Sequence, residues 1–111
     1  MKPITNNILL SAVSSTTESD AIGNQTADVA SIEVSGTATS FTLSVQGKVN
    51  TESGWTNLAV INMASLALAQ SITAFGIYEA GIEGMTAIRL NLSAVTGGNV
   101  TATVKTVNTA E

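Results

Sequence analysis

Short runs of alternating apolar and polar residues follow one another along this chain, separated by polar or glycine-containing turns. In the clearest run, Phe41, Leu43, Val45 and Val49 share one face. A period of two places successive side chains on opposite faces, so each run predicts a half-buried β-strand. The predicted strands cover residues 8–14, 29–34, 41–49, 55–62, 75–79, 88–93 and 100–105, with an edge strand around residues 18–22.

Glycines mark several of the predicted turns. Gly47 interrupts the strand over residues 41–49, where we expect a β-bulge. Gly97 and Gly98 stand between the last two alternating runs, and this arrangement is a strong hairpin signal. We therefore expect the last two strands to pair with each other. The longer connection after residue 62 is expected to hold a helical turn around residues 65–69.

A sheet that is apolar on one face buries that face against a second sheet. The pattern therefore predicts an all-β chain folded as a β-sandwich of about seven or eight mostly antiparallel strands. With 111 residues, the chain has room for one such domain. We expect residues 21–111 to form the sandwich and residues 1–20 to form either an N-terminal strand or a docking arm that orders on binding.

Charged residues make up only 11% of the chain, and serine and threonine fill much of the polar surface. The net charge is −4, and the four cations are scattered at Lys2, Lys48, Arg89 and Lys105. Nucleic acids and anionic membrane surfaces require clustered cations, so we expect neither as a partner. Low charge also reduces repulsion between copies, which permits self-association. No apolar run predicts a signal peptide or a membrane span.

The chain contains no histidine and no cysteine, which removes the usual general base, the nucleophilic triads and the common zinc ligands. The acidic residues lie mostly in predicted loops and form no evident catalytic pair. We therefore expect no enzymatic activity and no cofactor. Asp20, Asn24 and Asp28 are spaced loosely enough for a calcium loop, but the lack of a compact ligand pattern favours an ordinary polar loop and no metal.

Trp55 and Tyr78 are the only tryptophan and the only tyrosine, and they are the candidate contacts for a ligand or partner. Exposed together, they would form a stacking platform for sugar rings. With so few aromatic residues, we favour instead a Trp55 that covers the core and a partly buried Tyr78. Arg89 lies opposite to its apolar neighbours on the predicted strand, and we expect it to pair with an acid.

The order of these motifs resembles a β-sandwich module of bacteriophage and prophage virion accessory proteins. The resemblance implies a jelly-roll sandwich similar in shape to carbohydrate-binding modules. Such modules occur in head decoration proteins, head fibres, and tail or baseplate proteins. The segments that carry the resemblance are residues 31–36, 41–47, 54–58, 76–79, 87–92 and 97–102.

The resemblance implies a virion protein, made in the host cytoplasm. Because the module fills most of the chain, we expect a capsid decoration or head-fibre subunit that binds the assembled shell. Its partners would be the major capsid protein or other virion subunits. The alternative is a sugar-binding adhesion module of a phage tail or baseplate, with a host-surface glycan as its ligand. A structural module of a bacterial surface is a third reading, which the lack of a signal peptide disfavours.

Overall fold

Two antiparallel sheets form the part of the chain that the computed structural model describes, residues 2–24 and 26–109, with side chains from residue 6 onward. Residues 1, 25, 110 and 111 lie outside this part, including those within the predicted ranges 1–20 and 21–111. The six-stranded sheet follows the order β1 (Lys2–Val13), β11 (Val100–Asn108), β4 (Val29–Gly36), β9 (Gly76–Gly81), β7 (Val60–Asn62) and β8 (Leu68–Ala69). The five-stranded sheet contains β2 (Thr17–Glu18), β10 (Ala87–Thr96), β5 (Ser40–Lys48) and β6 (Thr56–Asn57), with β3 (Ile22–Gly23) also paired to β10.

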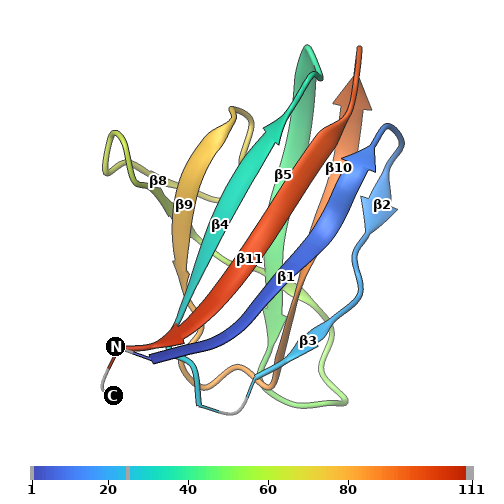
Figure 1. Cartoon of the computed structure of the whole chain (residues 1–111). Helices are drawn as coiled ribbons and strands as arrows, with labels where there is room; N and C mark the ends of the chain where they lie inside the picture. The colour runs from blue at the N-terminus through green and yellow to red at the C-terminus, as the bar shows by residue number, and fades with distance from the viewer. Residues whose placement is uncertain (1, 25, 110–111) are drawn as a thin grey trace.

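The two sheets lie face to face (Figure 1), so the predicted β-sandwich is confirmed. The strands β2, β3, β6 and β8 have only two residues each, and the other seven account for the predicted number. The core lies between the sheets, and alternate residues of the long strands fill it as predicted. Its largest fully buried side chains include Ile32, Val34, Leu43, Val45, Ile88, Leu90, Leu92 and Val100.

The first and last strands of the chain lie side by side. β1 pairs with β11 from Lys2, opposite Asn108, to Val13, opposite Val100. Leu10 is buried in the core, and after β1 the chain continues into β2, which pairs with β10 in the other sheet. Residues 2–13, expected as a strand or a docking arm, thus form an edge strand of the six-stranded sheet (Figure 1).

The predicted hairpin between the last two strands is wrong, because β10 and β11 belong to different sheets. The loop over residues 97–99 crosses from the five-stranded to the six-stranded sheet. A second crossing, over residues 37–39, joins β4 to β5 directly beside it. The main-chain N–H groups of Thr37 and Ala38 donate to the Asn99 carbonyl at 3.0 and 3.1 Å, which ties the two crossings together.

The glycines of these crossings allow the close approach of the two backbones. Gly97 and Gly98 have φ values of +73° and +147°, in the region that favours glycine. A Cβ atom at Gly98 would lie 2.6 Å from the backbone of Thr37, and one at Gly36 would lie 2.2 Å from the Asn99 carbonyl oxygen. Gly97 and Gly98 therefore form a corner where the chain passes from one sheet to the other. The same glycine pattern also occurs in hairpin turns.

Two further predictions about the middle of the chain are wrong. Residues 55–62, predicted as one strand, divide into β6 in one sheet and β7 in the other. No helix forms over residues 65–69: a single turn over residues 62–66 comes before β8, and β7 and β8 form a hairpin. Leu66 adopts φ +61° at the tip, and its N–H donates to the Asn62 carbonyl at 2.6 Å. The alternating leucines and alanines of this segment fit a short strand as well as a helical turn.

The end of β5 also differs from the expectation. Gly47 lies in register opposite Ile88, without a bulge, and the register shift occurs on β10 between Leu92 and Ala94. Gly47 points inward, where an added Cβ would lie 3.0 Å from the Leu58 side chain and 3.1 Å from the Met85 sulfur. Val49 lies beyond the last paired residue of β5 and is exposed. The glycine therefore provides space for neighbouring side chains.

Candidate functional site

Trp55 lies on the outer face of the five-stranded sheet, directly before β6, and is half-buried. The Lys48 amine lies 4.7 Å from the centroid of its ring, and the Arg89 guanidinium carbon lies 4.5 Å from it. Cations at this distance from an indole are attracted by its π electrons. The structure therefore brings two of the chain's four cationic residues to its single tryptophan.

Arg89 also belongs to a network of side-chain interactions that extends across neighbouring strands of this sheet. Its guanidinium forms a salt bridge of 3.1 Å with Glu18 on β2, which confirms that it pairs with an acid. Its Nε donates to the side-chain Oε1 of Gln46 at 2.9 Å, and the side-chain Nε2 of Gln46 donates to Oδ1 of Asn57 on β6 at 2.9 Å. Together with Trp55 and Lys48, these residues form what we call the Trp55 cluster.

The Trp55 cluster contains residues that the sequence pattern did not single out. Gln46 is buried although it occupies an outward position of β5, because its amide is held between Arg89 and Asn57. Beside the cluster, at Glu18, lies a hollow of about 340 Å³. The hollow is lined mainly by hydroxyl, amide and carboxylate groups, from Thr16, Thr17, Glu18, Asn91, Leu92 and Ser93. Such groups form hydrogen bonds with polar ligands.

Tyr78, the second candidate contact, lies on β9 in the other sheet and points into the core. It is 4% exposed, and its hydroxyl donates to the Ala74 carbonyl at 2.8 Å. Tyr78 and Ala80 occupy the inward positions of β9, so the strand period itself buries the ring. The structure does not bring Tyr78 and Trp55 together, and Tyr78 offers no open ring face in this arrangement.

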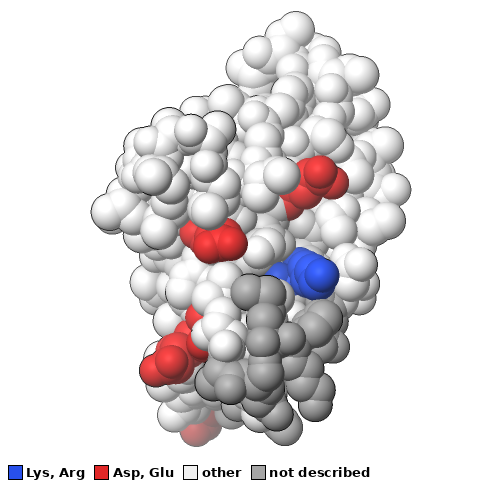
Figure 2. All heavy atoms as spheres, turned by 60° about the vertical axis from the view of Figure 1, so that its left-hand side comes forward, with Lys and Arg blue, Asp and Glu red and all other residues white. Residues whose placement is uncertain are grey.

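Exposed apolar side chains gather instead at the other edge of the molecule, on and beside the β7–β8 hairpin. We call this surface the hairpin patch, and it consists of Ile61, Met63, Leu66, Leu68 and Ile77, which are 38–73% exposed. Ile61 on β7 lies directly opposite Leu68 on β8, and the Met63 N–H donates to the Ile77 carbonyl at 2.9 Å. Figure 2 shows this side of the molecule as a broad uncharged surface interrupted by a few separate charged side chains.

The hairpin patch is unusual for an outward sheet face, where polar residues normally alternate with the core residues. Contiguous exposed apolar surface on a folded domain commonly marks an interaction site. β8 is the last strand of its sheet, so the patch also reaches a sheet edge. The sequence pattern did not predict this surface, because the residue type does not show whether a leucine faces the core or the solvent. The pairing of the strands determines which face each leucine occupies.

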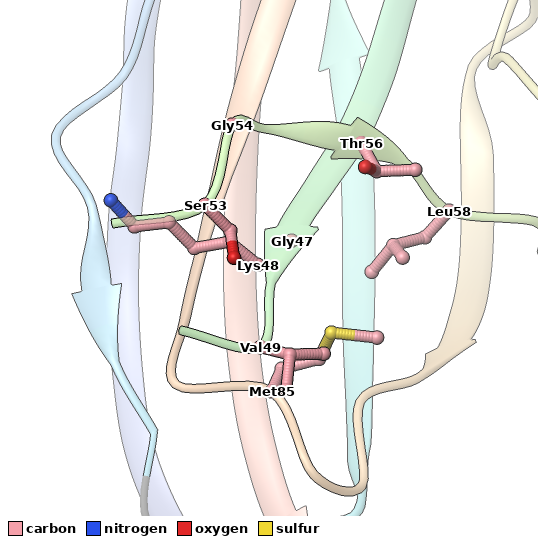
Figure 3. A pocket seen from close by; sticks show the side chains of 8 residues that line it. All are labelled: Gly47, Lys48, Val49, Ser53, Gly54, Thr56, Leu58 and Met85. Atoms are coloured by element: carbon pink, nitrogen blue, oxygen red, sulfur yellow. The ribbon is translucent and has the colours of Figure 1, made fainter. Parts of the chain in front are cut away.

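A small apolar hollow of about 260 Å³ lies at the end of the sandwich, between β5 and the loop before β10 (Figure 3). The side chains of Leu58 and Met85 point toward one another across it, while the Lys48 amine points away. The remaining lining comes from Gly47, Val49, Ser53, Gly54 and Thr56. This lining presents apolar surface and two hydroxyls, and no acid.

The three residues considered for calcium have other roles or stand apart. The buried Asn24 amide donates to the carbonyls of Ala27, Ile82 and Met85 at 3.1–3.2 Å, and its oxygen accepts from the Ala27 N–H at 3.1 Å. It therefore ties two loops together. The Asp28 carboxylate accepts hydrogen bonds from the Thr109 hydroxyl and N–H, which lower the pKa of Asp28 below its ordinary value.

Asp20 is exposed and does not join Asp28 in a cluster of acids. Within residues 2–24 and 26–109, no three acidic side chains come together in a way that could hold a metal ion. The same part of the chain contains no helix long and apolar enough to cross a membrane.

No protein-family model and no curated protein sequence matches this chain. Two solved structures share its fold. The SPBc2 prophage-derived protein YomS has a TM-score of 0.83 and 18% identity, over 96% of each chain. The PBSX exported protein XepA has a TM-score of 0.86 and 18% identity, over 92% of this chain and 37% of its own. At this identity the likeness establishes that the chain has the β-sandwich fold of these two proteins.

Proposed function

We propose that this protein is an accessory subunit of a bacteriophage particle, of the jelly-roll kind that its motif order resembles. It docks on the assembled capsid shell as a decoration protein or a head-fibre subunit. The hairpin patch is the observation that carries the proposal, because it leaves five apolar side chains exposed on one edge of a folded sandwich. Burying apolar surface contributes roughly 25 cal/mol per Å².

The two structural neighbours support this proposal through their descriptions. YomS is described as prophage-derived, and its fold matches this chain over nearly the whole length of both. XepA is described as an exported protein of PBSX, and the same fold accounts for about a third of its length. A prophage-derived protein that consists almost wholly of this fold agrees with a small subunit of the virion.

Sedimentation with capsid shells tests the proposal. The full chain is mixed with expanded shells assembled from the major capsid protein of the same genome, and bound protein is measured in the pellet. We expect saturation at a fixed number of copies per shell subunit. A protein that stays in the supernatant at every shell concentration would overturn the proposal.

A second candidate is a sugar-binding adhesion module of a tail or baseplate, with a host-surface glycan as its ligand. The half-buried Trp55 favours it, because this ring lies on an outer sheet face near the polar hollow that includes Glu18. A glycan array tests it. Binding that is lost in Trp55→Ala and retained in Tyr78→Phe would support it, and silence of the intact protein on a broad array would count against it.

A further inference from the structure

Two glutamates border the hairpin patch on the side of β9 and β4. Glu79 on β9 lies directly opposite Ile61 on β7, and Glu33 on β4 lies directly opposite Ile77 on β9. Residues opposite each other in an antiparallel pair have Cβ atoms about 4.5–5.5 Å apart. Each carboxylate is therefore an immediate neighbour of a patch residue, and a molecule that covers the patch will also meet these charges.

Neither glutamate has a salt bridge to any side chain that the structure describes, since the one such pair joins Arg89 and Glu18 on the other sheet. The nearest cation on this face is Lys105, which lies on β11 opposite Ser31 and diagonal to Glu33. Lys105 is two strands away from Ile77. Covering an unpaired carboxylate costs free energy unless the covering surface supplies a cation.

We infer that the hairpin patch binds a protein surface that is apolar at its centre and carries Lys or Arg where it meets Glu79 and Glu33. The apolar centre matches Ile61, Leu68 and Ile77, and the cations complement the two carboxylates. This inference rests on the proposed function, and it specifies which kinds of residue the shell presents to the patch. It also predicts that docking weakens as salt screens these charges.

A second copy of this chain fits the patch less well. A two-fold pairing of patches would place the glutamates of both copies in one interface. Each copy has one cation with a described side chain on this face, Lys105, two strands away from Ile77, because Lys48 and Arg89 lie on the opposite sheet over Trp55. An anionic membrane surface is disfavoured by the same carboxylates.

A charge reversal at the border tests the inference. Glu79→Lys is compared with Glu52→Lys, which makes the same change of charge in the exposed loop after β5. The Kd for expanded shells is measured at low and at high salt. We expect Glu79→Lys to weaken binding at least about tenfold at low salt, and Glu52→Lys to change it less than about twofold. Glu79→Gln should lose less affinity than Glu79→Lys and should reduce the dependence on salt.

The outcomes separate the inference from the proposed function. If the wild type and Glu79→Lys bind equally well while Leu68→Asp does not bind, docking through the patch stands and the charge inference fails. If the wild type does not bind, the proposed function fails and the inference fails with it. A wild-type dimer in sedimentation equilibrium that Leu68→Asp dissociates would overturn the choice of partner. Glu33→Lys repeats the test if thermal unfolding shows that Glu79→Lys is misfolded.

Discussion

The outer faces of the two sheets differ in whether their side chains find partners within the chain. On the five-stranded sheet, the Trp55 cluster pairs its members with one another, through the salt bridge between Arg89 and Glu18 and the bonds of Gln46. At the edge of the six-stranded sheet, the hairpin patch leaves Leu68 and Ile77 exposed beside two glutamates that form no salt bridge with a described side chain. A face whose side chains interact with one another stabilises the fold. A face with exposed apolar side chains and carboxylates outside any described salt bridge is the better candidate for binding another molecule.

The largest effect is expected where the sheets are joined, since a change there disturbs both faces at once. Gly98→Ala should lower the free energy of unfolding by at least about 3 kcal/mol, because the new Cβ would lie 2.6 Å from the Thr37 backbone at a residue with φ +147°. Urea unfolding measures the loss. Gly54→Ala is the control, since no atom lies within 4 Å of its Cβ position, and it should cost less than about 1 kcal/mol. Equal losses in the two variants would contradict the role of the corner.

The next effect separates binding from stability. Leu68→Asp places a charge in the hairpin patch and should weaken shell binding about a hundredfold, while the free energy of unfolding changes by less than about 1 kcal/mol. The stability should be kept because Leu68 is 73% exposed. Sedimentation with shells and urea unfolding measure the two quantities. Ser93→Asp introduces the same charge on the other sheet, and an equal loss of binding there would remove the distinction between the faces.

Trp55→Ala should show the reverse behaviour. Removing the half-buried ring that Lys48 and Arg89 cover should lower the free energy of unfolding by about 1–3 kcal/mol, with shell binding unchanged. Urea unfolding and sedimentation again provide the measurements. A variant of full stability that loses binding to a glycan would instead assign the Trp55 cluster to sugar recognition.

The smallest effect concerns Asp28, whose carboxylate, in contrast to that of Glu79, accepts hydrogen bonds from another residue of the chain. The bonds from Thr109 hold the pKa of Asp28 below its ordinary value. The carboxylate therefore stabilises the folded state above the ordinary pKa of about 3.9, and this contribution disappears as the pH falls through the lower pKa of the folded state. Asp28→Asn should reduce the loss of stability as the pH falls below about 4. Thermal unfolding across this range measures it, and an unchanged pH profile would contradict the role of the Thr109 bonds.

The sequence predicted the inward faces of the strands well, because alternation is a local property. Ile32, Leu43 and Leu90 are buried as expected. It did not predict which strands pair, because pairing depends on contacts between distant residues. Gly97 and Gly98 suit a hairpin turn and a corner between sheets equally, and only the approach of Thr37 distinguishes them.

The candidate sites were predictable to a similar extent. Trp55 stood out as the single tryptophan, but the register of β5, β6 and β10 was needed to bring Lys48, Gln46 and Arg89 to it. The hairpin patch could not be found from the sequence. The segment around Leu66 and Leu68 fitted a helical turn, and its pairing with β7 turns Leu68 outward.

The position of β11 determines when this chain can fold. β11 follows the other described strands in chain order, yet it lies inside the six-stranded sheet between β1 and β4. The edges of β1 and β4 that face each other therefore stay unpaired until β11 has joined them. Pairing between residues so distant in sequence is slow, and exposed strand edges invite aggregation meanwhile. The six-stranded sheet is thus complete only when β11 has joined β1 to β4.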